Sequence, residues 1–347
     1  MPVLRICHVN LARTFRGGER QTLLLASECV KRYGIGRTLL VCRRGGTLAA
    51  RAGEIKGLEI YEVDSQFSGH YQVNQWIPDL VHAHEGRAVY WGFIHDILFG
   101  TPYILTRRIQ NQHKPRFLNI LAYQRARHIV AISRAIEAEL RERFTSTTVI
   151  PSTVAPKSSH SRRICEKIPR SILMAGALDP AKGHKVMLRA LISMPTDWTL
   201  YIIGDGAELE SIAQFINAHG LQNRTHLYAW DSDKAHTLFE TCEYFAMPSI
   251  HEGLGSVLID AMNAECLVVA SDIGGIPDLV IDGVSGRLFP TNNALAIANT
   301  LVDLDGHQSL KQALIEAGKE IASQHVPSVM MSKYEVVYHQ VASEFKT

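Results

Sequence analysis

The sequence predicts an α/β protein built from two doubly wound parallel sheets that follow one another along the chain. Short apolar runs alternate with amphipathic stretches from one end to the other, which is the pattern of strands joined by helical crossovers. The alternation stops once, near the middle of the chain, and then starts again. At 347 residues the chain is also long enough for two hydrophobic cores of ordinary size.

The first half contains apolar runs that predict buried parallel strands, because each run is short and carries few polar residues. These runs are 4–9, 38–42, 58–63, 80–84, 103–106 and 128–132. Helices are predicted between them, for example over 19–31 and 116–125. Ser133 is the expected N-cap of a further helix that reaches about Arg143, since a serine hydroxyl can accept a hydrogen bond from a free amide of the first turn.

Residues 152–168 interrupt this pattern, because they lack periodicity and carry proline, serine and basic residues. Afterwards strands are predicted at 172–175, 199–203, 225–228, 244–247, 267–270 and 286–289, and helices at 184–194, 208–219, 256–264 and 294–303. We therefore predict one Rossmann-like domain over 1–166, a second over 167–325, and a final helix within 326–347 that has no strand after it.

The composition argues against several classes of protein. Lys and Arg number 36 and Asp and Glu 34, and a formal net charge of +2 argues against a protein that coats nucleic acid. No apolar run approaches the roughly 18–20 residues that span a bilayer. Residues 1–9 predict a strand rather than a signal peptide. The six cysteines are scattered without a Cys-x-x-Cys pair, which favours reduced thiols and a cytoplasmic location.

Two glycine-containing turns are candidates for phosphate binding. Gly17 and Gly18 lie between the first strand and the first helix, where backbone amides can approach an anion closely. Lys182 and Gly183 follow the first strand of the second half, where a lysine can hold a phosphate as a point charge. Either turn is also compatible with a plain connection that binds nothing. The first turn is not a GxGxxG fingerprint, which disfavours a nicotinamide cofactor.

Residues 251–262 are the most informative segment. Glu252 lies in a loop flanked by glycine, and a helix is expected to begin near Gly255, where its first amides can meet a diphosphate. Asp260 lies about one turn into that helix. The two carboxylates can each accept hydrogen bonds from vicinal hydroxyls, which a sugar nucleotide offers on its hexose and on its ribose. The alternative is an acidic turn followed by a surface aspartate.

Taken in order, these motifs resemble the retaining glycosyltransferases of family 4, in which two Rossmann-like domains form the GT-B fold with a cleft between them. The resemblance covers essentially the whole chain and is strongest from about 170 to 290. It is carried by Gly17-Gly18, Lys182-Gly183, Gly204-Asp205-Gly206, Pro248-Ser249, the run from Glu252 to Gly255, Asp260-Ala261-Met262 and Gly274-Gly275-Ile276-Pro277.

The resemblance implies a nucleoside-diphosphate sugar as donor, with a UDP-sugar favoured, bound mainly by the second domain. It implies an acceptor bound mainly by the first domain, a final helix that packs back on that domain, and neither a cofactor nor a metal ion. The catalytic candidates are Glu252, Lys182 and His84. The donor-binding candidates are Gly17, Gly18, Lys182, Trp230, Glu252, Gly253, Leu254, Gly255, Ser256, Val257 and Asp260.

The same resemblance implies a role for each side chain. Glu252 would contact the donor sugar, and Lys182 would neutralise the departing diphosphate. Asp260 would hold the ribose hydroxyls, although the family usually has a glutamate there, which is one methylene longer. The backbone near Trp230 would meet the base, and the turn at Gly17 would close over the diphosphate.

Two departures from the family pattern affect these expectations. Ala177 stands where the family usually has an arginine that binds the diphosphate, so one cation is missing, and Arg107 or Arg108 is a candidate replacement. The histidine that many members carry after the fifth strand is also absent, and His84 is the nearest candidate. His82 and His84 form a His-x-His pair, but because no carboxylate or cysteine cluster accompanies them, packing is expected rather than metal binding.

The implied reaction is transfer of a hexose from the nucleotide to an acceptor hydroxyl, with retention of the anomeric configuration. Two alternatives remain: a GT-B sugar-nucleotide epimerase, which needs no separate acceptor, and a sugar-nucleotide-binding subunit with weak or lost catalysis. Product analysis without acceptor separates the first alternative, and donor hydrolysis would exclude the second.

The net charge of +2 hides an asymmetry. Residues 1–166 contain 24 Lys and Arg against 13 Asp and Glu, whereas residues 167–347 contain 12 against 21. Basic and apolar residues are interleaved over 107–143, a pattern that can dock on an anionic membrane surface and is also typical of a solvated helix face. We therefore expect an anionic or lipid-linked acceptor, such as a lipopolysaccharide or polyprenyl-diphosphate glycan. Peripheral association with the inner face of the cytoplasmic membrane is expected with it.

Overall fold

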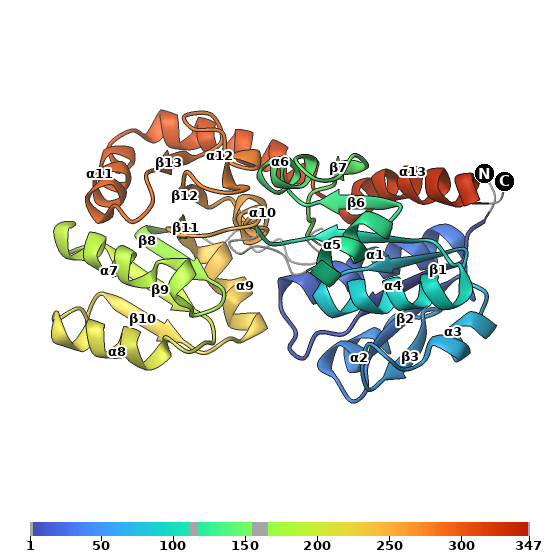
Figure 1. Cartoon of the computed structure of the whole chain (residues 1–347). Helices are drawn as coiled ribbons and strands as arrows, with labels where there is room; N and C mark the ends of the chain where they lie inside the picture. The colour runs from blue at the N-terminus through green and yellow to red at the C-terminus, as the bar shows by residue number, and fades with distance from the viewer. Residues whose placement is uncertain (1–2, 111–116, 155–165, 346–347) are drawn as a thin grey trace. The chain divides into compact units, whose positions relative to one another are not determined.

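The computed structural model describes residues 3–110, 117–154 and 166–345 (Figure 1). The chain divides into two compact units. Unit 1 comprises Met1–Ala155 and Val326–Thr347, and unit 2 comprises Pro156–His325. The final segment of the chain therefore belongs to the same unit as the first strands.

Unit 1 is built on a seven-stranded parallel sheet in the order β3-β2-β1-β4-β5-β6-β7. Its strands are β1 (Ile6–Asn10), β2 (Thr38–Arg43), β3 (Glu59–Val63), β4 (Leu80–Ala83), β5 (Tyr103–Arg107), β6 (His128–Ala131) and β7 (Thr147–Val149). The strand order reverses between β1 and β4, and ligands of such sheets bind at the carboxyl ends of strands at this switch point.

The helices of unit 1 are α1 (Gly17–Tyr33), α2 (Thr47–Ala52), α3 (His70–Gln75), α4 (Gly86–Phe99), α5 (Phe117–Arg125), α6 (Arg134–Arg141) and α13 (Pro327–Phe345). Helix α13 packs against α1 and β4 and contributes Met330, Tyr334 and Tyr338 to the buried core. The hydroxyl of Tyr338 lies 2.8 Å from Nδ1 of His82 on β4. These contacts make the final helix part of the core of unit 1.

Unit 2 is built on a six-stranded parallel sheet in the order β10-β9-β8-β11-β12-β13. Its strands are β8 (Ile168–Ala175), β9 (Thr199–Ile203), β10 (Thr225–Tyr228), β11 (Cys242–Met247), β12 (Leu267–Ser271) and β13 (Arg287–Phe289). Its helices are α7 (His184–Ser193), α8 (Leu209–Ala218), α9 (Ser232–Thr241), α10 (Val257–Asn263), α11 (Ala294–Asp305) and α12 (Gln308–Ser323). Helix α7 packs against α8 and α11, while α10 packs against α12.

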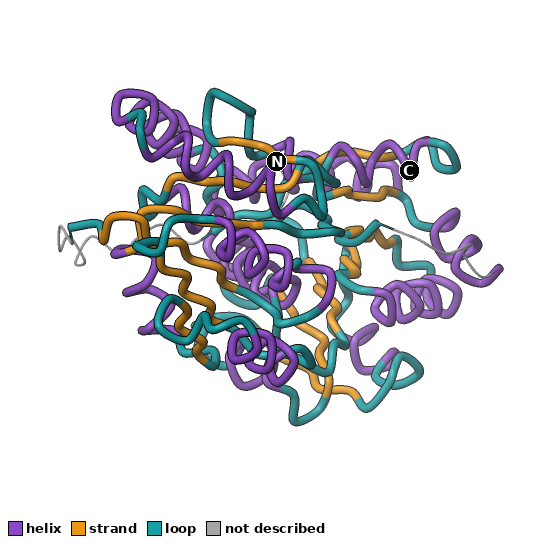
Figure 2. The backbone as a smooth tube through the Cα atoms, turned by 90° about the vertical axis from the view of Figure 1, so that its left-hand side faces the viewer, coloured by secondary structure: helices purple, strands orange, loops and turns teal. Residues whose placement is uncertain are grey.

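A second view, turned by 90°, shows the strands bordered by helices (Figure 2). In the described residues no helix is both long enough and apolar enough to cross a membrane.

The cysteines at 7, 29, 42, 242 and 266 are buried free thiols. Cys165 and most of the segment expected to link the two halves lie outside the described residues.

The strands expected from the sequence are present, with ends that shift by up to four residues. Ser133 caps α6 as expected, because its hydroxyl accepts from the amide of Ile136 at 3.3 Å. The bounds of helix α4, which lies between two predicted strands, were missed, since the helix is apolar around most of its circumference and shows no polar face. Strand β7 was also missed, because it is only three residues long and half-buried at the sheet edge.

Candidate functional site

An ammonium–carboxylate pair lies at the carboxyl edge of the unit 2 sheet. Lys182 ends a short 3-10 turn after β8, and Glu252 lies in the loop after β11. Nζ of Lys182 and Oε2 of Glu252 are 2.5 Å apart. The two side chains are 28% and 13% exposed, so the pair is partly shielded yet reachable from solvent. The structure thus brings together the two residues of unit 2 that were expected to be catalytic.

Close backbone packing holds the pair in place. The amide of Ile250 donates to the carbonyl of Ala181 at 2.7 Å, which joins the two loops directly. Gly183 has a φ of +70°, and a Cβ added there would lie 2.0 Å from the carbonyl oxygen of Pro248. Only glycine satisfies both conditions, because it tolerates left-handed backbone and carries no side chain.

We expect Gly183→Ala to destabilise unit 2 by about 3 kcal/mol or more, because the new Cβ must displace a backbone carbonyl. Gly220→Ala is a matched control, since Gly220 also has a positive φ, +65°, but an added Cβ meets no atom within 4 Å. That control should lose only about 1–2 kcal/mol from the left-handed conformation. Amide hydrogen exchange of α7 measures the difference, and equal losses in the two variants would contradict the clash.

The loop that follows Glu252 presents backbone amides beside the pair. Oε1 of Glu252 accepts from the amide of Gly253 at 3.2 Å, and Gly255 turns the chain with a φ of +81°. Helix α10 begins at Val257, two residues after Gly255, where its start was expected, and it spans only seven residues. The backbone amides that this segment offers therefore belong to the turn more than to a long helix. Asp260 lies in the first turn of α10 and is partly buried.

The loops after β9 and β10 are joined by Asp205, a residue not singled out as a site candidate. Its Oδ1 accepts from the backbone amide of Trp230 at 3.2 Å. Trp230 is 48% exposed and follows the edge strand β10, with β9 and β8 between it and β11. Asp205 lies between Gly204 and Gly206, and a Cβ on either glycine would clash with backbone after β8. The Gly-Asp-Gly pattern was the signal in the sequence that could have identified Asp205 as the residue that joins these two loops.

Unit 1 presents a second glycine turn at the carboxyl end of β1. Gly17 and Gly18 form the first residues of α1, and the amide of Arg16 donates to Oε2 of Glu19 at 2.8 Å. A Cβ added to Gly17 would meet no atom within 4 Å, so this position faces open space. A Cβ added to Gly18 would lie 3.5 Å from Cδ of Arg108. Burial lowers the pKa of Arg108, and Tyr334 and Glu19 act in the opposite direction.

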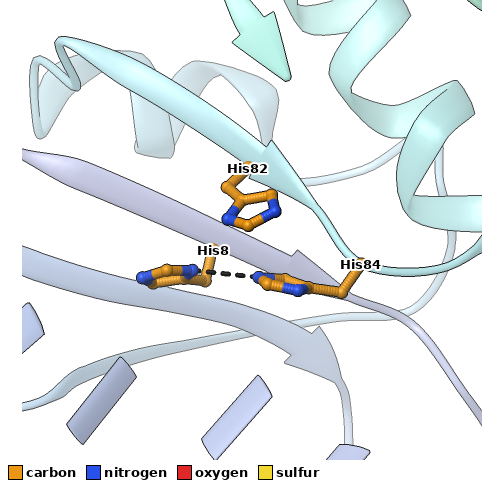
Figure 3. A group of neighbouring side chains, drawn as sticks. All are labelled: His8, His82 and His84. Carbon is orange, nitrogen blue, oxygen red and sulfur yellow. Dashed lines mark hydrogen bonds between the residues drawn. The ribbon is translucent and has the colours of Figure 1, made fainter. Parts of the chain in front are cut away.

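His84 belongs to a buried group of three histidines (Figure 3). His8 and His82 are register partners on β1 and β4. Nδ1 of His8 and Nε2 of His84 are 3.0 Å apart, and Nε2 of His82 lies 2.7 Å from the hydroxyl of Thr106. His84 is only 2% exposed, so the structure places it beneath the surface at the end of β4. In this position His84 contacts His8 and His82, and its catalytic role stays a prediction.

The same three histidines fit a metal ion poorly. One nitrogen from each lies within 4.8 Å of the others, but the group contains neither a carboxylate nor a thiolate. Both nitrogens of His82 already have partners, and the positive Arg108 lies close enough to lower the pKa of His82 and His84. The outer nitrogens of His8 and His84 have no hydrogen-bond partner, whereas metal-bound histidines almost always have one.

Unit 1 should lose stability on acidification. Burial lowers the pKa of His8 to about 3 and keeps the pKa values of His82 and His84 well below the usual 6.5. Below pH 6.5 these histidines are protonated in the unfolded chain but remain neutral in the folded unit. Each histidine therefore lowers the free energy of unfolding of unit 1 by up to about 1.4 kcal/mol per pH unit as the pH falls from 6.5 towards the pKa of that histidine in the folded state. Stability contributed by these residues is complete above pH 6.5.

Amide hydrogen exchange of β1 and β4 at pH 7.5 and 5.0, corrected for intrinsic rates, checks this expectation for unit 1 alone. The stability of unit 1 should depend less steeply on pH in His8→Gln, because this variant carries one titrating group fewer. An identical slope in this variant and the wild type would contradict it.

Comparison with known proteins relates these features to an enzyme family. The structure of Anabaena HepE in complex with UDP-glucose superposes with a TM-score of 0.83 at 20% identity, covering 97% of this chain and all of that one. Residues 162–321 match the family model of group 1 glycosyl transferases. An uncharacterized glycosyltransferase of Methanocaldococcus jannaschii is 26% identical over 253 residues, 70% of each chain. The chain has the GT-B fold, and its residues 162–321 are similar to the group 1 glycosyl transferases.

A further relative of this chain is the phosphatidyl-myo-inositol mannosyltransferase of Mycobacterium leprae. It is 28% identical over 294 residues, which cover 79% of this chain and 78% of the relative. The matched family segment contains Lys182, Glu252 and the glycine turn that leads from Glu252 into α10. The glycine turn of α1, Arg108 and the three histidines lie outside that segment.

Proposed function

We propose that the enzyme transfers a hexose from a UDP-sugar to an acceptor hydroxyl, with anomeric retention and without a metal ion. The observation that carries this proposal is the pair of Lys182 and Glu252, held 2.5 Å apart beside a glycine turn inside the matched family segment. The HepE structure is described as a complex with UDP-glucose, which supports the choice of nucleotide.

The reaction balances without a dedicated protein nucleophile. The bond between the anomeric carbon and the diphosphate oxygen breaks, and its electron pair stays on that oxygen. The acceptor oxygen forms the new bond on the same face of the sugar, and its proton passes to the departing phosphate. Lys182 and the turn amides from Leu254 to Val257 stabilise the negative charge that develops on the leaving group.

Each remaining donor contact has its own residue. Glu252 is released from Lys182 when the diphosphate binds, and its carboxylate then accepts hydrogen bonds from the donor sugar. Asp260 accepts from the ribose hydroxyls, and the backbone near Trp230, fixed by Asp205, meets the base. In unit 1, Arg108 beside Gly18 supplies the cation that Ala177 does not provide.

The acceptor we propose is a lipid-linked glycan of the lipopolysaccharide or polyprenyl-diphosphate class, met at the cytoplasmic face of the membrane. The excess of basic residues in 1–166 supports this choice, as do the exposed Phe117 and Leu118 on α5. The relative named phosphatidyl-myo-inositol mannosyltransferase also supports a lipid acceptor. Binding to anionic vesicles that does not weaken with salt would contradict electrostatic docking.

A donor panel tests the proposed reaction. The full chain is incubated with UDP-, GDP- and ADP-sugars, and its melting temperature and the release of nucleotide are measured. We expect a UDP-sugar to raise the melting temperature and to be slowly hydrolysed, equally with and without EDTA. A sugar that changes configuration while still attached to the nucleotide would indicate an epimerase, and binding without any hydrolysis would indicate a binding subunit.

A further inference from the structure

A cavity of about 400 Å³ lies wholly within unit 1, at the carboxyl edge of its sheet. Gly86, the first residue of α4, and Arg107, the last residue of β5, form part of its lining, and α5 and α6 supply most of the rest. This volume falls in the range of small-molecule sites, roughly 300–1,000 Å³. None of the residues expected to bind the donor lines it.

The walls of the cavity combine aromatic rings with polar groups. The rings of Tyr123 and Phe144 pack with centroids 5.6 Å apart, and Nη1 of Arg107 donates to the Tyr123 hydroxyl at 3.3 Å. From α4, the Tyr90 hydroxyl donates to Oδ1 of Asn119 on α5 at 2.6 Å. Donors, acceptors and apolar ring faces thus lie within one cavity.

The charge of the lining limits the ligand. Two arginines, Arg107 and Arg143, are matched by two glutamates, Glu139 and Glu142, so the lining is close to neutral. A phosphate placed here would meet two carboxylates, whereas an uncharged polyol can donate to the carboxylates and accept from the guanidinium groups. A sugar ring also presents an apolar C–H face that can pack against Tyr123 or Phe144.

We propose that this cavity binds a neutral saccharide unit of the acceptor, the one nearest the hydroxyl that receives the donor sugar. The inference rests on the proposed transferase function. It adds the chemical class of the acceptor portion that binds in the cavity of unit 1. Its place supports it, because Arg107 in the lining is followed directly by Arg108, which lies against the Gly18 turn. Any anionic or lipid portion of the acceptor then lies outside this cavity, over the basic surface.

The test uses octyl β-glucoside and octyl β-galactoside as probes, with octyl phosphate as the charged comparison at the same chain length. Saturation-transfer NMR on the full chain measures their binding below the micelle concentration. We expect both glycosides to bind and to compete with each other, and octyl phosphate to displace them at least tenfold less well. Displacement of the glycosides by octyl phosphate at lower concentration than by each other would overturn the assignment to a neutral saccharide, as would the failure of both glycosides to bind.

Matched variants locate the binding. Gly86→Trp narrows the cavity without backbone strain, since Gly86 has no positive φ and an added Cβ meets no atom within 4 Å. Arg87→Trp places the same side chain on the next, exposed residue, which does not line the cavity. Glycoside affinity should fall at least tenfold in Gly86→Trp and remain unchanged in Arg87→Trp. Asn119→Ala should weaken glycoside binding as well, and circular dichroism is used to check that this variant is folded.

UDP binding, measured by calorimetry in the same variants, separates this inference from the transferase proposal. We expect unchanged UDP affinity in all three. Equal glycoside affinity in wild type, Gly86→Trp and Asn119→Ala would overturn the saccharide site while leaving the donor site intact. If the wild-type chain does not bind UDP, the proposed transferase function is overturned, regardless of the affinity for the glycosides.

Discussion

Replacing Lys182 with methionine should lower kcat for sugar transfer at least tenfold, which corresponds to about 1.4 kcal/mol or more of lost transition-state stabilisation. The ammonium lies 2.5 Å from Glu252 in the free enzyme, and in the proposed reaction it faces the charge that grows on the departing diphosphate. Because this charge is larger in the transition state than in the bound donor, the effect should fall on kcat more than on KM.

Lys185 provides the matched control for this prediction. It lies three residues further along the chain, forms an ion pair with Glu208 at 2.9 Å, and is 34% exposed, compared with 28% for Lys182. Lys185→Met removes a similar ion pair from the same unit, and we expect nearly unchanged kcat. Equal losses in the two variants would point to a general effect on unit 2 rather than to leaving-group stabilisation. Glu252→Ala should also lower turnover at least tenfold, since the donor sugar loses its carboxylate contact.

Replacing Arg108 with methionine should weaken UDP binding at least tenfold and UMP binding much less. Arg108 lies against Gly18, at the start of a helix whose first amides have no partner within the helix. A guanidinium here can hold a diphosphate through two parallel hydrogen bonds, which a lysine cannot reproduce. Arg108→Lys should therefore restore only part of the affinity.

Calorimetric titration with UDP and UMP measures this difference directly. Arg107→Met serves as the comparison, because Arg107 points its Nη1 to Tyr123 in the cavity of unit 1. We expect its UDP affinity to match the wild type. If Arg107→Met weakened UDP binding as much as Arg108→Met, the assignment of the replacement cation to Arg108 would be wrong.

Much of the fold could be predicted from the sequence, because periodic burial is a local property. The strand β9 has the predicted bounds, 199–203, since its apolar run is short and is followed directly by Gly204. Helix α12 was not predicted, although its buried side chains include Leu314 and Ala322. It lies between α11 and α13, so that three helices follow one another without the alternation that marked the other elements.

The candidate site was predictable to a different degree in each unit. In unit 2 the glycine-flanked motifs identified Lys182 and Glu252, because the need for glycine at a close backbone approach is visible in the sequence. In unit 1 the sequence offered both Arg107 and Arg108 and could not separate them. It also offered His84 without showing that this side chain is buried against His8, a residue 76 positions away.

By itself the sequence determined that the chain alternates strands and helices, that it does so in two blocks, and that particular glycines, carboxylates and one lysine lie at strand ends. Periodicity and residue type carry this information because neighbouring residues share one element. The tertiary structure alone decided which side chains meet: that Lys182 pairs with Glu252, that Tyr338 on the final helix reaches His82, and that Arg108 lies beside Gly18. Such contacts depend on strand order and on the path of each loop in space, and no local pattern encodes either of these.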